Sequence, residues 1–416
     1  MQAWHFTETA YPYLPPADTY ESVRVNLPNR IYDPQKGAAL YDRYIKEWQI
    51  AEEEGVEIML NEHHQTVTCV DPAAPLMLAA LARVTSKARL LILGNPIANR
   101  HQPVRVAEEM AMIDIMSHGR LEAGFVRGVP YELLPANSNP MRMNERHWEA
   151  LDLIVKTWTE HDGPFSHEGR YFQYRAINIW PRPWQQPHPP VWVSTTSASG
   201  SIRVGSHGYV QATFLTGYEG TRSVYESYRR GWRDAGRGND VPIDRLAYAA
   251  LVYVGDSEAK ARAGADKLLW YLNANKVARQ FATPPGYAGT AASVAALKAT
   301  GATTQGDHAN FGRNMDVDTA MERGIMFAGT PDQVYKQIKK FYDHVGGFGH
   351  LLIMGQAGFL EHDDTVHGIR MFAREVYPRL KEENPGTNLS GVFPQTSGAA
   401  APGRPVPRAE APTPLG

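Results

Sequence analysis

Cysteine is almost absent from this chain, whose 416 residues include Cys69 alone. A single thiol excludes an internal disulfide and a cluster of thiolates around a metal. Long apolar runs are also missing, since none approaches the roughly 20 residues of a membrane-spanning helix. Residues 1–5 lack the charged and apolar regions of a signal peptide, so we expect a cytoplasmic protein.

The chain also lacks an excess of charge of either sign. Lys and Arg number 42 and Asp and Glu 44, which gives a formal net charge of −2. This balance does not favour binding to nucleic acid or to an anionic membrane surface. What the chain does have is a hydrophobic content of 43%. At this length such a composition can bury the core of one large α/β domain with insertions.

One stretch, residues 90–128, contains a complete unit of strand, helix and strand. Leu90–Gly94 and Leu121–Val126 are short apolar runs, as expected for parallel strands that are covered on both faces. Apolar residues recur at helical spacing between the two runs, after Pro103 at a first helical position. Asn95-Pro96 follows the first strand and Arg127-Gly128 the second. Polar residues and glycine at the carboxyl ends of parallel strands indicate a ligand site.

Short apolar strands alternate with helices along most of the chain. Eight of them favour a (β/α)8 TIM barrel, class α/β, over residues 1–383. An insertion over about residues 281–323, at the carboxyl-terminal mouth of the barrel, interrupts the pattern. Residues 384–416, rich in Pro, Gly and Ala, are predicted to be a disordered tail. The predicted strands are Ala3–Phe6, Val56–Leu60, Leu90–Gly94, Leu121–Val126, Val191–Val193, Tyr209–Phe214, Ala247–Gly255 and His350–Met354.

Glu62, His63 and His64 follow the second predicted strand, at the catalytic mouth of such a barrel. One imidazole could face the lumen as a general base, since the unperturbed pKa of histidine, about 6.5, lies near neutrality. The two rings could equally be loop histidines that are bonded to carbonyls. A metal site is a weaker third interpretation, because adjacent histidines rarely point at one ion and no H-x-H or H-E-x-x-H motif supplies further ligands.

Arg127 and the run at residues 196–200 have features that suit an anion. A guanidinium matches phosphate in fork geometry, and small hydroxyl residues at a helix start offer free N–H groups to the same charge. The alternatives are an ion pair at the barrel rim for Arg127 and an ordinary helix cap for Ser197 and Ser199. Together, the two features indicate a phosphorylated ligand.

The chain resembles the luciferase-like flavin monooxygenases, the superfamily of bacterial luciferase, alkane monooxygenases and deazaflavin-dependent reductases. The resemblance covers roughly residues 3–380 and implies a barrel that binds reduced FMN at its mouth, where O2 gives a flavin hydroperoxide. It is carried by EHH at 62–64, HQPVRVAEEMAMIDIMSHGRL at 101–121, GFVRG at 124–128, WPRPWQQPHPPVWV at 180–193, TSASG at 196–200 and GTPDQV at 329–334.

The resemblance also implies roles for single residues. His63 matches the catalytic base of the family. The residues that it assigns to the flavin are Asn95, Arg127, Gly128, Val129, Ser197 and Ser199, with Arg127 and Ser197 at the phosphate. Phe6, Glu62 and His64 are assigned to the substrate pocket, and no metal is expected. Thr196 and Val126 replace an acidic residue and a reactive cysteine of bacterial luciferase, which argues against light emission.

These features predict an FMNH2-dependent monooxygenase that inserts one atom of O2 into a small organic substrate. No G-x-G-x-x-G follows a strand, so a separate NAD(P)H:flavin reductase is expected as partner. A homo-oligomer, such as a homodimer, is also expected. The alternatives are a deazaflavin (F420)-dependent hydride-transfer oxidoreductase and, with less support, a metal-dependent hydrolase. The resemblance also implies a cis peptide at the end of the strand at residues 90–94, and the Asn95–Pro96 bond is predicted to be that bond, since a cis bond costs little before proline.

Overall fold

Eight parallel strands close into a barrel in the computed structural model, which describes residues 1–274, 276–282, 284–287, 294 and 315–383. Their order around the barrel is β1-β2-β3-β4-β7-β8-β9-β11, and β11 pairs with β1 to close it. The (β/α)8 prediction is confirmed. The strands are β1 (Gln2–Thr7), β2 (Glu57–Leu60), β3 (Leu90–Pro96), β4 (Leu121–Val126), β7 (Val191–Ser194), β8 (Val210–Phe214), β9 (Leu246–Val254) and β11 (His350–Gln356).

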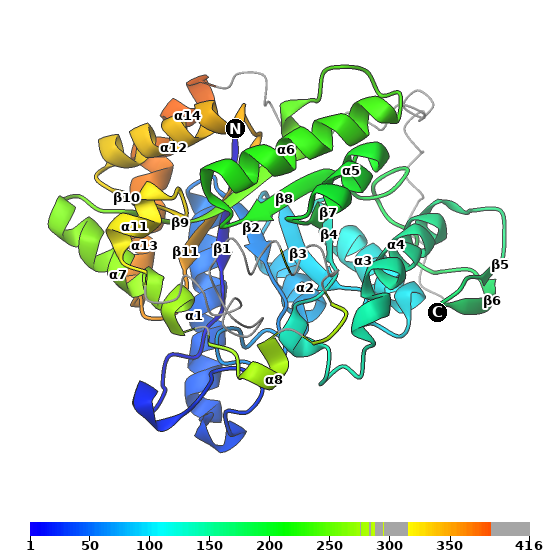
Figure 1. Ribbon diagram of the computed structural model, residues 1–416, viewed down its shortest axis with the longest axis horizontal. Helices are drawn as coiled ribbons and strands as arrows, with labels where there is room; N and C mark the ends of the chain where they lie inside the picture. Colours follow the sequence, from blue (N-terminus) through cyan, green and yellow to red (C-terminus); the bar gives the residue numbers. More distant parts are fainter. Residues whose placement is uncertain (275, 283, 288–293, 295–314, 384–416) are drawn as a thin grey trace, which may run out of the picture.

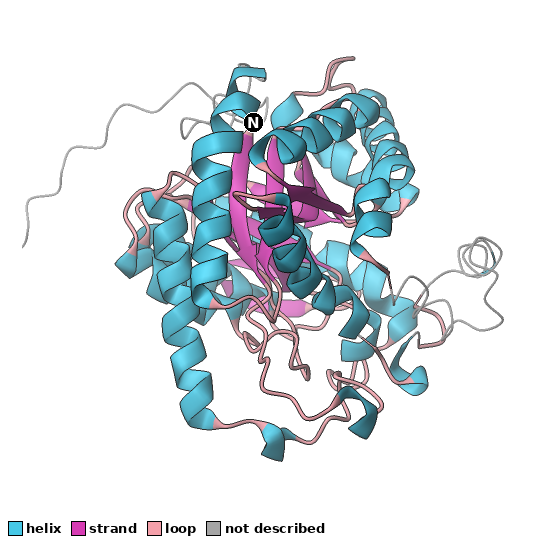
Figure 2. Ribbon diagram, turned by 90° about the vertical axis from the view of Figure 1, so that its left-hand side faces the viewer, coloured by secondary structure: helices cyan, strands magenta, loops and turns pink. Residues whose placement is uncertain are grey.

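Helices surround these strands (Figures 1 and 2). Several begin where the sequence places a proline in the first turn or a capping side chain, as at Asp33, Ser197 and Thr330. The helices are α1 (Pro34–Glu53), α2 (Ala74–Val84), α3 (Pro103–Met116), α4 (Met143–Thr159), α5 (Ala198–His207), α6 (Gly217–Asp234), α7 (Glu258–Ala274), α8 (Arg279–Ala282), α11 (Val317–Glu322), α12 (Pro331–Val345), α13 (His362–Met371) and α14 (Tyr377–Glu383).

Short helical turns complete the connections. A π-helical turn, η6 (Phe372–Val376), joins α13 to α14. The 3-10 turns are η1 (Ala17–Thr19), η2 (Asn29–Ile31), η3 (Pro130–Glu132), η4 (Pro140–Arg142) and η5 (Ile243–Arg245).

The barrel lumen is packed with large side chains. Trp4 of β1 meets Trp192 of β7 edge to face, with ring centroids 5.5 Å apart, and Phe6 meets Phe214 of β8 at 6.1 Å. All four residues belong to the lumen or its mouth, because side chains alternate between the two faces of a strand. A second apolar layer fills the space between strands and helices. The closed core leaves the loops at the carboxyl ends of the strands free to form a site.

Two strand features were not predicted. β10 (Met326–Gly329) pairs with β9 from Leu251 onward, beyond the segment of β9 that pairs with β8. A run of four residues carries too little pattern to be recognised without its partner. The antiparallel hairpin β5 (Phe165–Glu168) and β6 (Gln173–Ile177) lies in the aromatic and Pro-rich segment, at the right-hand edge of Figure 1.

The prediction of a cis bond between Asn95 and Pro96 is wrong. The cis bond of this strand joins Leu93 to Gly94, and two others precede Pro181 and Pro187. The irregular backbone lies at the glycine, because the pairing of β3 with β4 shifts register between Ile92 and Asn95. A Cβ atom at position 94 would lie 2.8 Å from Val126 Cγ1 and 3.2 Å from the carbonyl oxygen of Gly124, so the two strands approach closely there.

Two sequence predictions fall wholly or partly on residues that the structure does not describe. The tail, 384–416, lies outside the described residues, as does most of the insertion at 281–323. The described end of that insertion includes α11. Within the described residues, no helix is long and apolar enough to cross a membrane.

Candidate active site

A cavity of about 890 Å³ lies at the carboxyl ends of the strands. Strands and loops that are distant in the sequence supply its walls, as the closed barrel requires. Asn95 is not on the wall but fully buried beside it, and its side-chain oxygen accepts a hydrogen bond from Arg100 at 3.4 Å. The predicted site residues that line the cavity are Phe6, Glu62, His63, Arg127, Gly128, Val129, Ser197 and Ser199.

His63 is held by a carboxylate that the sequence gave no reason to select. Its Nδ1 lies 3.0 Å from Oε1 of Glu132, in η3, and the same oxygen accepts the backbone N–H of His64 at 2.9 Å. Burial raises the pKa of Glu132, but the contacts with His63 and His64 outweigh it and leave that pKa below the usual range. The carboxylate therefore accepts from Nδ1, which leaves Nε2 of His63 for a cavity ligand.

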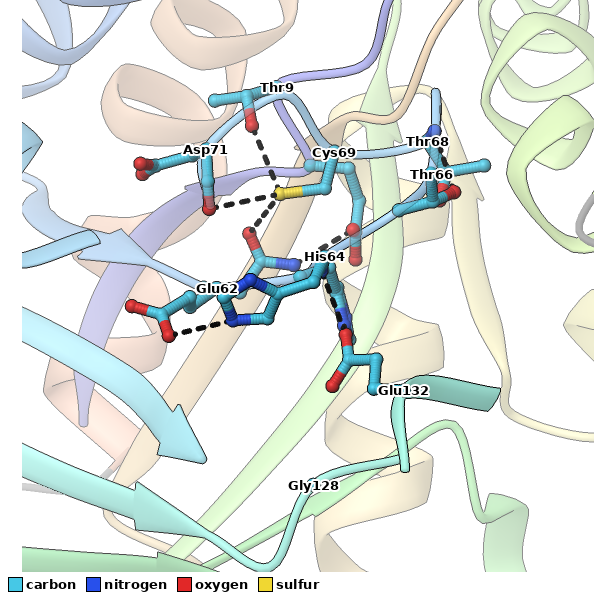
Figure 3. A network of polar contacts seen from close by, with 12 residues as sticks. Thr9, Glu62, His64, Thr66, Thr68, Cys69, Asp71, Gly128 and Glu132 are labelled. Carbon is cyan, nitrogen blue, oxygen red and sulfur yellow. Dashed lines mark hydrogen bonds and ion pairs between the residues drawn. The ribbon is translucent and has the colours of Figure 1, made fainter. Parts of the chain in front are cut away.

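His64 has a different partner and faces a different space. Its Nε2 lies 3.1 Å from Oε1 of Glu62, which Arg100 also contacts at 2.5 Å. The hydrogen bond to Glu62 raises the pKa of His64. Figure 3 shows this pair, with Glu132 on the other side of His64. His64 lines a separate pocket of about 150 Å³, shared with Arg100, and not the main cavity. The two adjacent histidines thus have different partners and face different spaces.

Arg127 lies on the cavity wall at the end of β4. Its guanidinium carbon is 3.9 Å from the centroid of the Tyr287 ring, and the Tyr287 hydroxyl donates to the carbonyl of Gly128 at 2.8 Å. Within the described part of the chain, Arg127 is paired with this ring and not with a carboxylate. An arginine stacked on an aromatic ring keeps its N–H groups available to an anion. Among the described residues, Arg127 therefore does not form the ion pair at the barrel rim that was the alternative interpretation of the sequence.

Ser197 begins α5 on the same cavity. Its hydroxyl caps the helix by accepting the backbone N–H of Gly200 at 3.2 Å, and it lies 3.3 Å from the Thr195 hydroxyl. Ser197 and Ser199 are both exposed. Ser197 is thus a helix cap, as one interpretation of the sequence expected. A cap is compatible with anion binding, since the other N–H groups of the first turn have no partner within the helix.

Several polar residues of the cavity were missed by sequence reasoning. Glu8 lies two residues after Phe6, and the alternation of a strand could have placed it on the same face. Tyr287 falls inside the segment that the sequence treats as an insertion. Nothing local singles out the others, because only the fold brings them to the mouth. The missed residues are Glu8, Arg24, Glu132, His147, Tyr271 and Tyr287.

A buried polar cluster lies behind the cavity wall (Figure 3). The Cys69 thiol lies 3.4 Å from the Thr9 hydroxyl and 3.7 Å from the side-chain oxygen of Asn61. Burial raises the pKa of Cys69 far above its usual range, so this thiol is unreactive. Burial, followed by the charge of Glu62, raises the pKa of Asp71 to about 7. Among the described residues, no group of His, Cys, Asp and Glu is arranged to hold a metal ion.

Several relatives of this chain are named as monooxygenases, which are oxidoreductases. Together with the barrel and the cavity at its mouth, they show that the chain is an oxidoreductase on a (β/α)8 barrel. The luciferase-like monooxygenase family model matches residues 24–347, so the chain belongs to that family. The superfamily resemblance inferred from the motifs is confirmed.

Two curated relatives and two solved structures illustrate the likeness. The oxygenase component of a flavin-dependent trigonelline monooxygenase from Acinetobacter baylyi is 30% identical over 249 residues, 59% of this chain and 68% of that protein. The 2,5-diketocamphane 1,2-monooxygenase 2 of Pseudomonas putida is 21% identical over 381 residues, 86% of this chain and 97% of that protein.

The solved structures show the fold. The oxygenating constituent of 3,6-diketocamphane monooxygenase from Pseudomonas putida, in complex with FMN, has a TM-score of 0.66 at 19% identity and covers 91% of this chain and 98% of its own. An F420-dependent secondary alcohol dehydrogenase has a TM-score of 0.64 at 17% identity and covers 93% and 98%. Flavin and deazaflavin proteins therefore share this architecture.

Proposed function

We propose that this protein is the oxygenase component of a two-component monooxygenase that uses reduced FMN and O2. The observation that carries the proposal is one cavity holding three groups: Arg127 on its tyrosine, the exposed start of α5, and His63 on Glu132. The first two suit a phosphate, and the third suits proton handling beside a ring.

The residues present fit a flavin mononucleotide. A cavity of about 890 Å³ is large enough for a ligand of this size together with a small substrate. Gly128 has a φ of +96°, and a Cβ there would lie 2.8 Å from the Asn99 side-chain nitrogen, so the wall next to Arg127 tolerates no side chain. Arg127, Ser197 and Ser199 would hold the phosphate, and Gly128 and Val129 would line the approach to it.

Reduced FMN bound there would supply the electron pair that activates O2, so that one oxygen atom enters the substrate and the other leaves as water. The protein's own residues would position the ligands and transfer protons. Glu132 fixes His63 with Nδ1–H directed at the carboxylate, so Nε2 can accept a proton from a ligand and return it. The aromatic rings of Phe6 and Phe214 line the same space and would keep water away from a ligand bound there.

The relatives support the choice of cofactor and partner. One curated relative is named as an oxygenase component, and one solved relative is in complex with FMN. We therefore propose a separate NAD(P)H:flavin reductase as partner and a small organic substrate. The homo-oligomeric state and the cytoplasmic location expected from the sequence stay predictions.

Anaerobic titration tests the cofactor. The purified protein should bind reduced FMN more tightly than the reduced deazaflavin F420. Incubation of a compound library with FMN, a flavin reductase and isotopically labelled O2 should then give a product that carries one labelled oxygen. Tighter binding of F420, with hydride transfer and no label in any product, would replace the proposal with the deazaflavin alternative.

The phosphate contact makes a separate prediction. Charge-assisted hydrogen bonds contribute about 1.5 to 3 kcal/mol, so Arg127→Ala should weaken binding of reduced FMN by roughly tenfold to a hundredfold. Binding of reduced riboflavin, which lacks the phosphate, should change little. Equal weakening for both flavins would show that Arg127 supports the fold instead. Titration of the flavin fluorescence or absorbance measures both.

A further inference from the structure

A tyrosine from outside the barrel strands lies on the arginine that is proposed to bind the phosphate. Tyr287 follows α8 and is separated from Gly128 by 159 residues, yet both line the main cavity beside Arg127. The guanidinium carbon of Arg127 lies 3.9 Å from the centroid of the Tyr287 ring. This distance is within the range of a cation–π contact, which holds a guanidinium against the face of the ring. The protein therefore covers one face of the guanidinium.

The hydroxyl of Tyr287 fixes the ring to the end of β4. It donates a hydrogen bond to the carbonyl oxygen of Gly128 at 2.8 Å, and it also hydrogen-bonds to the guanidinium of Arg127. One hydroxyl can make both contacts, because its proton points at the carbonyl while its oxygen accepts from an N–H group. The ring and the hydroxyl thus restrain Arg127 together. A guanidinium has several N–H donors, so this restraint leaves donors for an anion.

Tyr287 is itself held in place by packing. Its ring packs against a small buried apolar cluster at the side of the cavity. A Cβ atom at Gly286 would lie 2.3 Å from Cγ of Met141, so the chain before Tyr287 is packed tightly against the cavity rim. The cluster comes from the loop after β3, the loop after η3 and the start of α4, and consists of Ala98, Leu133 and Met143.

We propose that Tyr287 is a positioning residue, which holds Arg127 in the orientation that binds the phosphate of the cofactor. This role rests on the proposed function, because it takes the phosphate of FMN as the ligand of Arg127. An arginine that is already ordered loses less conformational freedom when the anion binds, so affinity rises without a contact between Tyr287 and the phosphate. Tyr287 thereby sets the selectivity of the site for flavins with a phosphate over flavins without one.

A pair of flavins tests this role without turnover. Reduced FMN and reduced riboflavin differ in the phosphate alone, so the ratio of their affinities isolates the contribution of the phosphate site. In Tyr287→Leu, which removes the ring and the hydroxyl, the preference for FMN should fall by about tenfold, as expected when one long side chain must be ordered on binding. In Tyr287→Phe, which keeps the ring, it should fall by about threefold. The affinity for riboflavin should change little in either variant.

A double variant shows whether Tyr287 acts through Arg127. In the Arg127→Ala background, Tyr287→Leu should have no further effect on the preference for FMN, since the group that Tyr287 positions is gone. Tyr335→Leu is the matched control. Arg379 lies over the Tyr335 ring at the same distance, 3.9 Å, but the pair belongs to α12 and α14 and does not line the cavity. This variant should bind both flavins as the wild type does.

NMR tests the contact without any flavin. The Nε–H signal of Arg127, assigned by its loss in Arg127→Ala, should be shifted upfield by the ring current in the wild type and in Tyr287→Phe. The shift should be lost in Tyr287→Leu. An Arg127 signal that Tyr287→Leu leaves unchanged, equal weakening of both flavins, or an additive effect in the double variant overturns the proposed role.

Failure of the proposed function looks different, because the wild type then has no affinity for reduced FMN. In that case titration with inorganic phosphate, followed on the Arg127 signal, decides the role of Tyr287. Weaker binding of phosphate in Tyr287→Leu than in the wild type supports it, and equal binding overturns it.

Discussion

At the scale of single residues, the hydrogen-bond partners of His63 and His64 decide which space each ring faces. His63 is oriented by Glu132 toward the main cavity, whereas His64 is bonded to Glu62 and lines the smaller pocket. The sequence could not show which of the two rings faces the cavity, because the side chains of neighbouring loop residues have no fixed direction. A carboxylate that comes from the loop after β4 decides which ring faces the main cavity.

This separation predicts different effects for two substitutions. His63→Ala should bind reduced FMN within about threefold of wild type, since the proposed phosphate contacts are untouched, but should release hydrogen peroxide in place of product. His64→Ala should be milder, because it loses mainly a structural bond. Oxygen consumption, peroxide and labelled product, measured together, decide the matter. Normal coupling in His63→Ala would contradict the assignment of His63 as the functional base.

Asp71 makes a prediction about stability. Its pKa is raised from 3.8 to about 7 by burial, so between these values the folded state holds a proton that the unfolded state has lost. Unfolding then releases a proton, and stability falls as pH rises through this range, by on the order of 4 kcal/mol in total. Because the asparagine side chain of Asp71→Asn cannot ionise, this variant should not show the fall in stability as pH rises.

The expected result is that Asp71→Asn is more stable than wild type at about pH 8 and similar to it at about pH 4. Denaturant midpoints at both pH values measure the difference. Asp18→Asn, on the exposed turn η1, is the control and should leave the pH dependence of the midpoint unchanged. A wild type whose stability is independent of pH across this range would show that Asp71 is ionised in the fold.

At the scale of elements, the strand pair β3 and β4 determines the shape of the cavity floor. Both strands carry a glycine where their backbones approach, Gly94 and Gly124. A Cβ at position 124 would lie 2.1 Å from the carbonyl oxygen of Ile92 and 2.8 Å from Leu93 Cδ1. The close approach sets the positions of Pro96 and Arg127 at the ends of these strands.

Gly124→Ala should therefore destabilise the protein by about 3 kcal/mol or more, because strand backbone cannot move as a flexible side chain can. Gly220→Ala, in α6, is the control. Its added Cβ would meet a Thr216 side chain at 3.1 Å, and alanine favours a helix, so its effect should stay within about 1 kcal/mol. Thermal or denaturant unfolding compares the two. Equal stability of both variants would show that β3 and β4 can separate at no cost.

At the scale of the molecule, closure of the barrel is what assembles the site. β11, at the end of the barrel, pairs with β1 at its start, and the cavity receives residues from position 6 to position 287. Residues 384–416 follow the last described helix, and the tail prediction rests on their composition alone.

A chain truncated after Glu383 should fold and bind reduced FMN as the full chain does. The reason is that the composition of the removed residues cannot bury enough apolar surface to offset their ordering entropy. Yield of soluble protein, thermal midpoint and flavin affinity are the measurements. Loss of any of the three would show that the tail docks on the barrel.

The sequence by itself determined the barrel, the order of most of its strands and helices, and eight of the residues that line the cavity. Hydrophobic periodicity and the polar residues after each strand are local signals, and in a parallel barrel all strand ends lie on one side. His63, Arg127 and Ser197 could be placed at one mouth for this reason.

Only the tertiary structure decided which of these side chains meet and what surrounds them. Glu132 at His63 and Tyr287 under Arg127 come from segments with no periodic pattern. Asn95, chosen from its place after a strand, is buried beside the cavity, and the cis bond lies at Gly94 and not before Pro96. Contacts of this kind depend on the register and direction of packed elements, which the spacing along the chain does not specify.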